Sequence, residues 1–327
     1  MCFIGSIRLY IQIIDFAAKK LHLQDREKLS FFVPILIYSP VFFLVANINL
    51  QLNDALFEIP NIVILTVILC SIAIGFCSFL KRRFYLPLMV AFSCCLCSSL
   101  VPTESFDLPF PPIMQNGIIA IVWFVFAYGQ LIFKKTDALF SAHSLALCIC
   151  LFVFYTFSGI SSTQLLLSAA FIGISLGYGV LNFPPAQLSI NSAALSSLGF
   201  LLGFVLIGCG AEGMVLPIII ILSYFIVYMI IGIYNTFFNN NKNFYTQPLE
   251  QIKLCFRIMF ILLFLAVMQM FVESSHSIFI FALLYAFWAI SRMGDQSNQG
   301  FMAINKEVLS NVKKGFRELR DLWDKKQ

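Results

Sequence analysis

Apolar runs of about 20 residues, separated by short polar breaks, recur along almost the whole chain. A helix of about that length crosses the roughly 30 Å hydrocarbon core of a bilayer. Of the 327 residues, 60% are hydrophobic and only 11% are charged, and the mean hydropathy is +0.90. These values exclude a soluble globular protein. The chain is therefore predicted to be an all-α, polytopic bundle of transmembrane helices.

The apolar runs define about eleven predicted spans. The first contains Arg8 and Asp15 and is followed by no small-residue cleavage signal, so we expect a retained helix and not a signal peptide. The predicted spans are 1–18, 31–50, 60–80, 84–102, 117–133, 138–158, 163–181, 193–211, 214–238, 254–272 and 277–293. Residues 1–293 thus form one transmembrane domain, and residues 294–327 form a separate tail.

Basic residues occupy alternate connections between the predicted spans. Every one of the 21 Lys and Arg residues except Arg8 falls on one side of the bundle, while the intervening connections carry acids and no base. Positive charge beside a span resists translocation, so the basic side is predicted to be cytoplasmic. With an odd number of spans, the N-terminus is then outside and the C-terminus is cytoplasmic.

The tail has an apolar residue at every third or fourth position between Ile304 and Trp323, with charged residues between them. This spacing predicts a basic amphipathic helix. Two interpretations stay open. The helix lies on the anionic inner leaflet of the bilayer, or it docks a protein partner.

Several other features have structural interpretations. Most of the ten cysteines fall within predicted spans, away from any His at ligand spacing, so we expect small apolar side chains and no metal site. The small residues Gly173, Ser175, Gly177 and Gly179 predict close helix contact. His143 lies within a predicted span, where an ionisable group is a hint of function. The scattered basic residues are explained by topology, so no nucleic-acid partner is expected.

The most specific motif lies between the seventh and eighth predicted spans. The run Asn182–Ala186 reads NFPPA, and Leu198–Phe200 reads LGF within a small-residue helix. The paired prolines remove amide donors, which predicts a helix end at the cytoplasmic surface. The segment resembles the corresponding loop of the polyprenyl-phosphate N-acetylhexosamine-1-phosphate transferases, bacterial enzymes that start lipid-linked glycan synthesis. The resemblance is strong over 176–203 and weak elsewhere, with a degenerate copy of the family's first cytoplasmic loop at 23–28.

The resemblance implies about eleven spans, an outside N-terminus, a bacterial inner (cytoplasmic) membrane and a polyprenyl-phosphate lipid as partner. It implies Mg²⁺ as a cofactor only if the chain is an active enzyme. The candidate substrate-binding residues on the cytoplasmic face are Lys81, Arg82, Arg83, Lys135 and Asn182. The basic cluster 81–83 also has a simpler interpretation as a topology determinant, with contact to a lipid phosphate as the alternative.

The acidic positions of the family are mostly replaced. Ser78 stands near the place of an Asp pair, Lys134 replaces the first Asp of an Asn-x-x-Asp-Gly-x-Asp-Gly segment, and only Asp137 survives. Asn191 and Ser192 stand at a Gly-Asp turn. Phosphotransfer from a nucleotide-diphosphate sugar needs a divalent cation, which carboxylates normally hold. Asp137 is the single acid in the inner connections between the second and ninth spans, so no conventional metal site is expected.

The leading prediction is a catalytically degenerate homologue that serves cell-envelope biology as a membrane scaffold or as a subunit binding a lipid precursor or a partner. One alternative is an active transferase with a rearranged site built on Lys134, Lys135 and Asp137. Asp137 is otherwise a solvated acid beside two lysines. The second alternative is a transporter, which the few ionisable groups in the spans disfavour. A cleft is expected between the regions of Ser78, Asp137 and Ser192.

Overall fold

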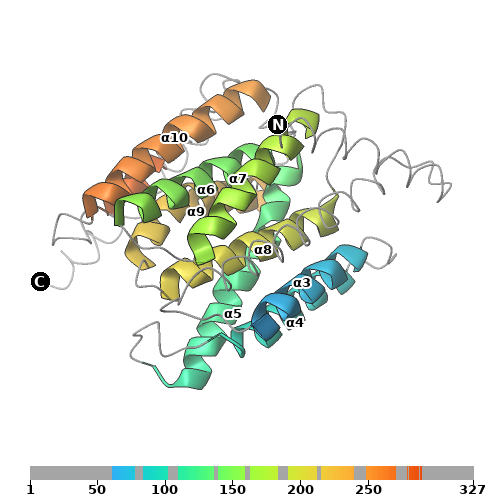
Figure 1. The fold of residues 1–327 in the computed structure, drawn as a ribbon. Coiled ribbons are helices and arrows are strands. Elements are labelled where there is room, and N and C mark those ends of the chain that lie inside the picture. Colours follow the sequence, from blue (N-terminus) through green and yellow to red (C-terminus); the bar gives the residue numbers. More distant parts are fainter. Residues whose placement is uncertain are drawn as a thin grey trace, which may run out of the picture.

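A computed structural model of the chain describes residues 61–77, 84–101, 110–135, 139–158, 163–182, 191–211, 215–238, 248–269, 278, 280–286 and 288. These residues are almost entirely helical and include no strand (Figure 1). The elements are α3 (Asn61–Phe76), α4 (Tyr85–Ser98), α5 (Pro112–Gly129), the 3-10 helix η3 (Gln130–Lys135), α6 (Leu139–Ser158), α7 (Thr163–Asn182), α8 (Ser192–Ala211), α9 (Val215–Phe238) and α10 (Pro248–Gln269). The predicted all-α class is confirmed for this part of the chain.

The helix boundaries differ from the predicted spans mainly at two prolines. Helix α5 begins at Pro112 and α10 at Pro248, several residues before the predicted starts at 117 and 254. Proline is well tolerated in the first helical turn, where its missing amide donor would have no intrahelical partner. The apolar run marks the part of a helix that suits lipid, whereas the helix itself begins earlier, in more polar sequence.

Among the residues that the structure describes, three helical stretches are long and apolar enough to cross a membrane, namely Pro112–Ile132, Leu139–Thr156 and Ser192–Ala211. Four shorter apolar helices accompany them, at Ile62–Phe76, Tyr85–Ser98, Val215–Ile230 and Cys255–Met268. This composition indicates a membrane protein. The predicted spans 1–18 and 31–50 and the tail helix Ile304–Trp323 lie outside the described residues, so the count of about eleven spans stays a prediction.

Helix α8 is the centre of the described bundle. Sixteen of its 20 residues are buried, and it contacts α3, α4, α5, α7, α9 and η3. Figure 1 shows α3 and α4 on one side of α8 and α6, α7 and α10 on the other. A helix that is apolar on all faces is a buried one. Protein, and not lipid, therefore covers α8 on most sides.

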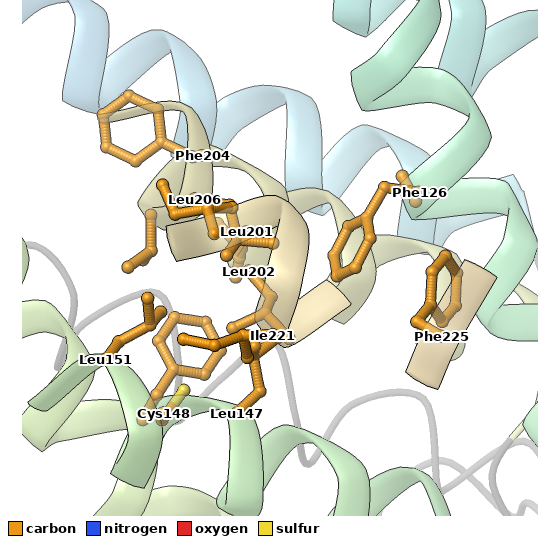
Figure 2. Packing of buried hydrophobic residues seen from close by; sticks show 14 of the residues in the cluster. Phe126, Leu147, Cys148, Leu151, Leu201, Leu202, Phe204, Leu206, Ile221 and Phe225 are labelled. Atoms are coloured by element: carbon orange, nitrogen blue, oxygen red, sulfur yellow. The ribbon is translucent and has the colours of Figure 1, made fainter. Parts of the chain in front are cut away.

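The buried side chains of α8 belong to one large cluster with residues of its neighbours. Figure 2 shows Phe204 and Leu206 of α8 in this cluster, together with Leu147 and Leu151 of α6 and Ile221 of α9. Dispersion contacts of this kind are individually small and collectively large. They hold the two halves of the bundle against α8.

Helices α5 and α8 pack closely at two glycines. A Cβ atom on Gly203 would lie 2.6 Å from Cδ1 of Trp123, and one on Gly199 would lie 2.5 Å from Cγ of Gln130. The Trp123 ring stacks on Phe200 with centroids 4.7 Å apart, and its Nε1 donates a hydrogen bond of 2.9 Å to the Phe200 carbonyl oxygen. Small residues let helix backbones approach in this way.

The small residues of α7 behave differently from one another. A Cβ atom on Gly173 would meet no atom within 4 Å, so the predicted close contact is wrong at this position. Ser175 does face a neighbouring helix, because its Oγ lies 3.0 Å from Oγ of Ser144 on α6. Sequence spacing alone did not distinguish the two, because glycine also occurs where a helix faces open space.

Candidate functional site

Helix α3, which ends two residues before Ser78, and the 3-10 helix η3, which ends in Lys134 and Lys135, meet at the first two turns of α8. Oγ of Ser71, in the last two turns of α3, lies 2.7 Å from Oγ of Ser197, and the Ser197 hydroxyl also donates a 2.9 Å hydrogen bond to the Ser71 carbonyl oxygen. Gln130, the first residue of η3, contacts Gly199, which lies two residues after Ser197 in α8. The end of α3, the start of η3 and the first two turns of α8 are therefore adjacent.

In the sequence, Lys81, Arg82 and Arg83 follow α3, and Lys134 and Lys135 end η3, so we name this end of the described bundle the basic end. It is the end where α3 and η3 finish and where α4, α6 and α8 begin. At the turn from α3 to α4, the Cys77 thiol donates to the Tyr85 carbonyl oxygen over 3.9 Å. Deeper in the same helix pair, the Cys97 thiol lies 3.8 Å from Sγ of Cys70, so the two helices are antiparallel.

Asn191 closes the N-terminus of α8 at the basic end. Its Oδ1 accepts a 2.7 Å hydrogen bond from the amide of Ala194, and its carbonyl oxygen accepts a 3.0 Å bond from the amide of Leu195. This is the N-cap arrangement that asparagine favours. Ser192 follows as the first residue of α8 and is half-buried. The structural role of Asn191 explains part of the polar sequence at this turn without catalysis.

The other predicted site residues are described only in part or not at all. Lys134 and Lys135 lie in η3, and Asn182 is the last residue of α7, but their side chains lie outside the described part. The predicted site residues wholly outside it are Ser78, Lys81, Arg82, Arg83 and Asp137. Within the described ranges, no group of three or more His, Cys, Asp or Glu residues is arranged to hold a metal ion. The expected cleft near Ser78, Asp137 and Ser192 stays a prediction.

His143 lies in the core and not in a polar channel. Its ring is fully buried and packs against Phe225, with centroids 5.6 Å apart, and against Tyr224, with centroids 5.8 Å apart. Both aromatic residues belong to α9. The contacts identify a packing role that joins α6 to α9, which the isolated histidine did not reveal in the sequence.

The cysteines of the described helices are free thiols, and all but Cys95 are buried. Cys150 of α6, for example, donates to the Met259 carbonyl oxygen of α10 over 3.6 Å. The predicted role of these residues as small buried side chains agrees with this packing. Sequence reasoning had not identified the helix partners of these thiols, since no spacing rule connects α6 to α10.

Gln130 is a buried polar residue that sequence reasoning missed. It is fully buried at the junction of α5 and η3, and neither atom of its amide has a hydrogen-bond partner in the described structure. An unpaired buried amide costs roughly 1–3 kcal/mol. We expect Gln130→Met, which keeps the length of the side chain, to raise the free energy of unfolding by about 1 kcal/mol in mixed-micelle unfolding experiments.

Gln115→Met is the matched control for this substitution. Gln115 lies in the first turn of α5, and its Nε2 donates a 2.7 Å hydrogen bond to the Phe110 carbonyl oxygen. Loss of this bond is expected to lower stability by about 1 kcal/mol. If Gln130→Met were destabilising to the same degree, the Gln130 amide would have a polar partner in the folded protein, and the expectation would be wrong.

In comparisons with known proteins, no family model and no curated protein matches this chain. The transferase resemblance therefore rests on the motif residues in the sequence. Of these, Leu198–Phe200 lies in the buried part of α8, where Gly199 contacts Ala127 and Gln130 and Phe200 contacts Trp123. In this chain, the described half of the motif packs α8 against α5.

Proposed function

We propose that this chain is a multi-pass membrane protein of the polyprenyl-phosphate sugar-1-phosphate transferase type that binds a polyprenyl-phosphate-linked precursor without transferring a sugar phosphate. The observation that supports the proposal is the meeting of α3, η3 and α8 through Ser71, Ser197 and Gln130. Lys134 replaces one acid of the transferase family, and Ser78 and Ser192 stand at other acidic positions, with Lys81, Arg82 and Arg83 close to Ser78 in the sequence. The site would then still bind the lipid phosphate but would no longer catalyse transfer of a sugar phosphate.

The charge balance favours an anion over a metal ion at the basic end. Lys81, Arg82 and Arg83 follow α3 within a few residues, and Lys134 and Lys135 end η3, against a single nearby acid, Asp137. Lysine and arginine bind phosphate oxygens through charge-assisted hydrogen bonds. Magnesium is normally held by carboxylates together with phosphate oxygens. One carboxylate beside five cations suits a lipid phosphate and is unfavourable for Mg²⁺.

The proposal also covers the setting of the protein. The transferase resemblance implies a bacterial inner membrane, and we propose that the basic end faces the cytoplasm, because positive charge beside spans is retained on that side. The segment Ile304–Trp323 would then lie on the anionic inner leaflet or bind a protein partner of cell-envelope assembly. Either role suits a scaffold that presents a lipid-linked precursor to another enzyme.

The experiment that tests this proposal measures binding of polyprenyl phosphate to the purified full-length chain in nanodiscs. Each cation near an anionic lipid contributes about 1 kcal/mol, so the triple change Lys81→Gln, Arg82→Gln and Arg83→Gln is expected to weaken binding by at least about ten-fold. A second variant, Lys134→Gln with Lys135→Gln, leaves the cluster 81–83 intact and is expected to weaken binding by a similar factor.

A variant of the tail provides the control with matched charge. The control changes Lys313, Lys314 and Arg317 to glutamine and removes three cations far along the sequence from the proposed site. Its affinity for polyprenyl phosphate is expected to stay within about two-fold of that of the unmodified chain. Equal weakening by the tail variant and the Lys81–Arg83 variant would indicate general attraction to the membrane surface and would contradict the proposal.

A further inference from the structure

A groove of about 730 Å³ opens on the flank of the bundle between α6, α10 and the pair Tyr285 and Trp288. This volume lies in the roughly 300–1,000 Å³ range of small-molecule binding sites. The described residues that line it are apolar or aromatic apart from one cation. The lining residues used below are Ile149, Phe256, Arg257, Phe260, Tyr285 and Trp288.

The groove faces the surroundings of the bundle, because large apolar side chains along it are exposed. Phe260 is 72% exposed and Trp288 is 53% exposed. In a bilayer such side chains contact lipid chains. Tyr285 and Trp288 lie side by side with ring centroids 6.1 Å apart, and these two residue types are enriched where the hydrocarbon meets the headgroups. The groove thus combines an apolar wall with an aromatic pair suited to the membrane interface.

Arg257 is close to the start of the apolar part of α10 and on the side of the basic end. The apolar run begins at Leu254, so Arg257 lies about 4.5 Å into it at 1.5 Å per residue. Ile252, in the second turn of α10, packs with Ala142, in the first turn of α6, and α6 begins just after η3. The exposed guanidinium therefore lies near the membrane surface at the basic end.

No described side chain of α10 offers an acid to pair with Arg257. Glu250 is the one acid of α10, and it precedes Arg257 by two turns, about 10 Å along the axis. Of the described residues that line the groove, none but Arg257 is charged. An arginine at the edge of the hydrocarbon is unfavourable unless an anion pairs with it, and a lipid phosphate matches the guanidinium through two parallel hydrogen bonds.

We propose that this groove binds an anionic phospholipid of the leaflet at the basic end, with its phosphate at Arg257 and an acyl chain along Ile149 and Phe260. The aromatic pair Tyr285 and Trp288 borders the bound lipid at the interface. This site lies on the flank of the bundle, apart from the meeting of α3, η3 and α8, and it does not rest on the proposed binding of a polyprenyl-phosphate precursor.

The experiment uses Trp288 as the reporter in the full-length chain. The sequence has three tryptophans, of which Trp123 is buried at 1% exposure, so a Trp323→Phe background leaves Trp288 as the indole that a lipid in the groove can reach. The protein is reconstituted in phosphatidylcholine vesicles with a fixed minor fraction of phosphatidylglycerol. Bromine, which quenches indole emission, is carried on the acyl chains of one lipid or the other, so the surface charge stays constant.

Brominated phosphatidylglycerol is expected to quench Trp288 with an association constant about five-fold above that of brominated phosphatidylcholine, since one cation near an anionic lipid contributes about 1 kcal/mol. Arg257→Gln is expected to reduce this ratio to near one, whereas Arg257→Lys keeps most of it. Trp288→Phe in the same background is expected to remove the difference in emission, which confirms the origin of the signal.

Three results would overturn the proposal. Equal quenching by the two brominated lipids would show no anionic preference, and a ratio unchanged in Arg257→Gln would exclude the guanidinium as the phosphate partner. Selective relief of the quenching by trace polyprenyl phosphate would assign the groove to that lipid instead. Circular dichroism of each variant separates a change in the groove from a failure to fold.

Discussion

Trp123→Ala is expected to lower the free energy of unfolding by about 3 kcal/mol, at the lower end of the range for loss of a buried tryptophan. Trp123 is 1% exposed, stacks on Phe200 at 4.7 Å and lies 6.1 Å from the ring of Phe204. Alanine would leave a cavity between α5 and α8 and remove the Nε1 hydrogen bond to the Phe200 carbonyl oxygen. We expect the lower end of this range because lipid chains are as apolar as the protein core, so the lost stability comes mainly from lost packing contacts.

The measurement is equilibrium unfolding in mixed micelles, followed by circular dichroism. Trp288→Ala is the matched control, since Trp288 is 53% exposed and packs against Tyr285 at the rim of the bundle. We expect the control to lose less than about 1 kcal/mol, as surface substitutions usually do. An equal loss of unfolding free energy in the two variants would contradict a large contribution of the contact between α5 and α8 to stability.

Gly203→Leu is expected to be destabilising by about 3 kcal/mol, at the upper end of the usual range, because overpacking of a filled interface forces side chains and backbone to shift. A Cβ atom at position 203 would lie 2.6 Å from Cδ1 and 2.7 Å from Nε1 of Trp123, and 3.4 Å from Cδ1 of Phe126. The indole is itself held by Phe200, so it has little freedom to move aside. Helices α5 and α8 would have to separate.

Gly117→Leu is the control for Gly203→Leu. Gly117 lies in the same helix as Trp123, but a Cβ atom there would meet nothing within 4 Å. Because leucine has the higher helix propensity, we expect this variant to be neutral or up to about 1 kcal/mol more stable. Thermal unfolding in detergent would measure both variants. Equal unfolding temperatures for Gly203→Leu and Gly117→Leu would contradict the close packing of α5 against α8 at Gly203.

The sequence was informative about where the helices begin and end. It was uninformative about which face of each helix packs against protein and which face is exposed. The predicted spans 138–158, 163–181, 193–211 and 214–238 agree with α6, α7, α8 and α9 to within one residue at each end. Apolar runs mark these helices directly. Phe204 is buried in α8, however, while Phe260 is 72% exposed on α10. Lipid chains and the protein interior are equally apolar, so composition carries no signal that separates the two environments.

The candidate site was predictable only at the level of segments. The motif at 182–186 and 198–200 and the replaced acids directed attention to the ends of α3, η3 and α8, and these elements do meet at Ser71, Ser197 and Gln130. The contacts themselves join residues far apart along the chain, such as Ser71 and Ser197. No local spacing marks such a pair, because it arises from the packing of whole helices.

The cap at Asn191 illustrates the difference between a motif and its role. The resemblance places Asn191 and Ser192 at the transferase family's Gly-Asp turn, whereas in the structure Oδ1 of Asn191 accepts a 2.7 Å hydrogen bond from the amide of Ala194. An asparagine directly before a helix of small residues is a recognisable N-cap signal. A reading based on local helix rules would therefore have found this role without reference to any family.

The proposal of binding without transfer is tested most directly by release of UMP. Purified protein would be incubated with Mg²⁺, polyprenyl phosphate and a panel of UDP-sugars, beside an Asp137→Ala variant and a parallel reaction in excess chelator. Binding without transfer predicts that UMP release by the unmodified protein equals that of Asp137→Ala under both conditions. Release above the Asp137→Ala level would contradict it, and release that persists in chelator would identify a metal-free site that uses Lys134, Lys135 and Asp137.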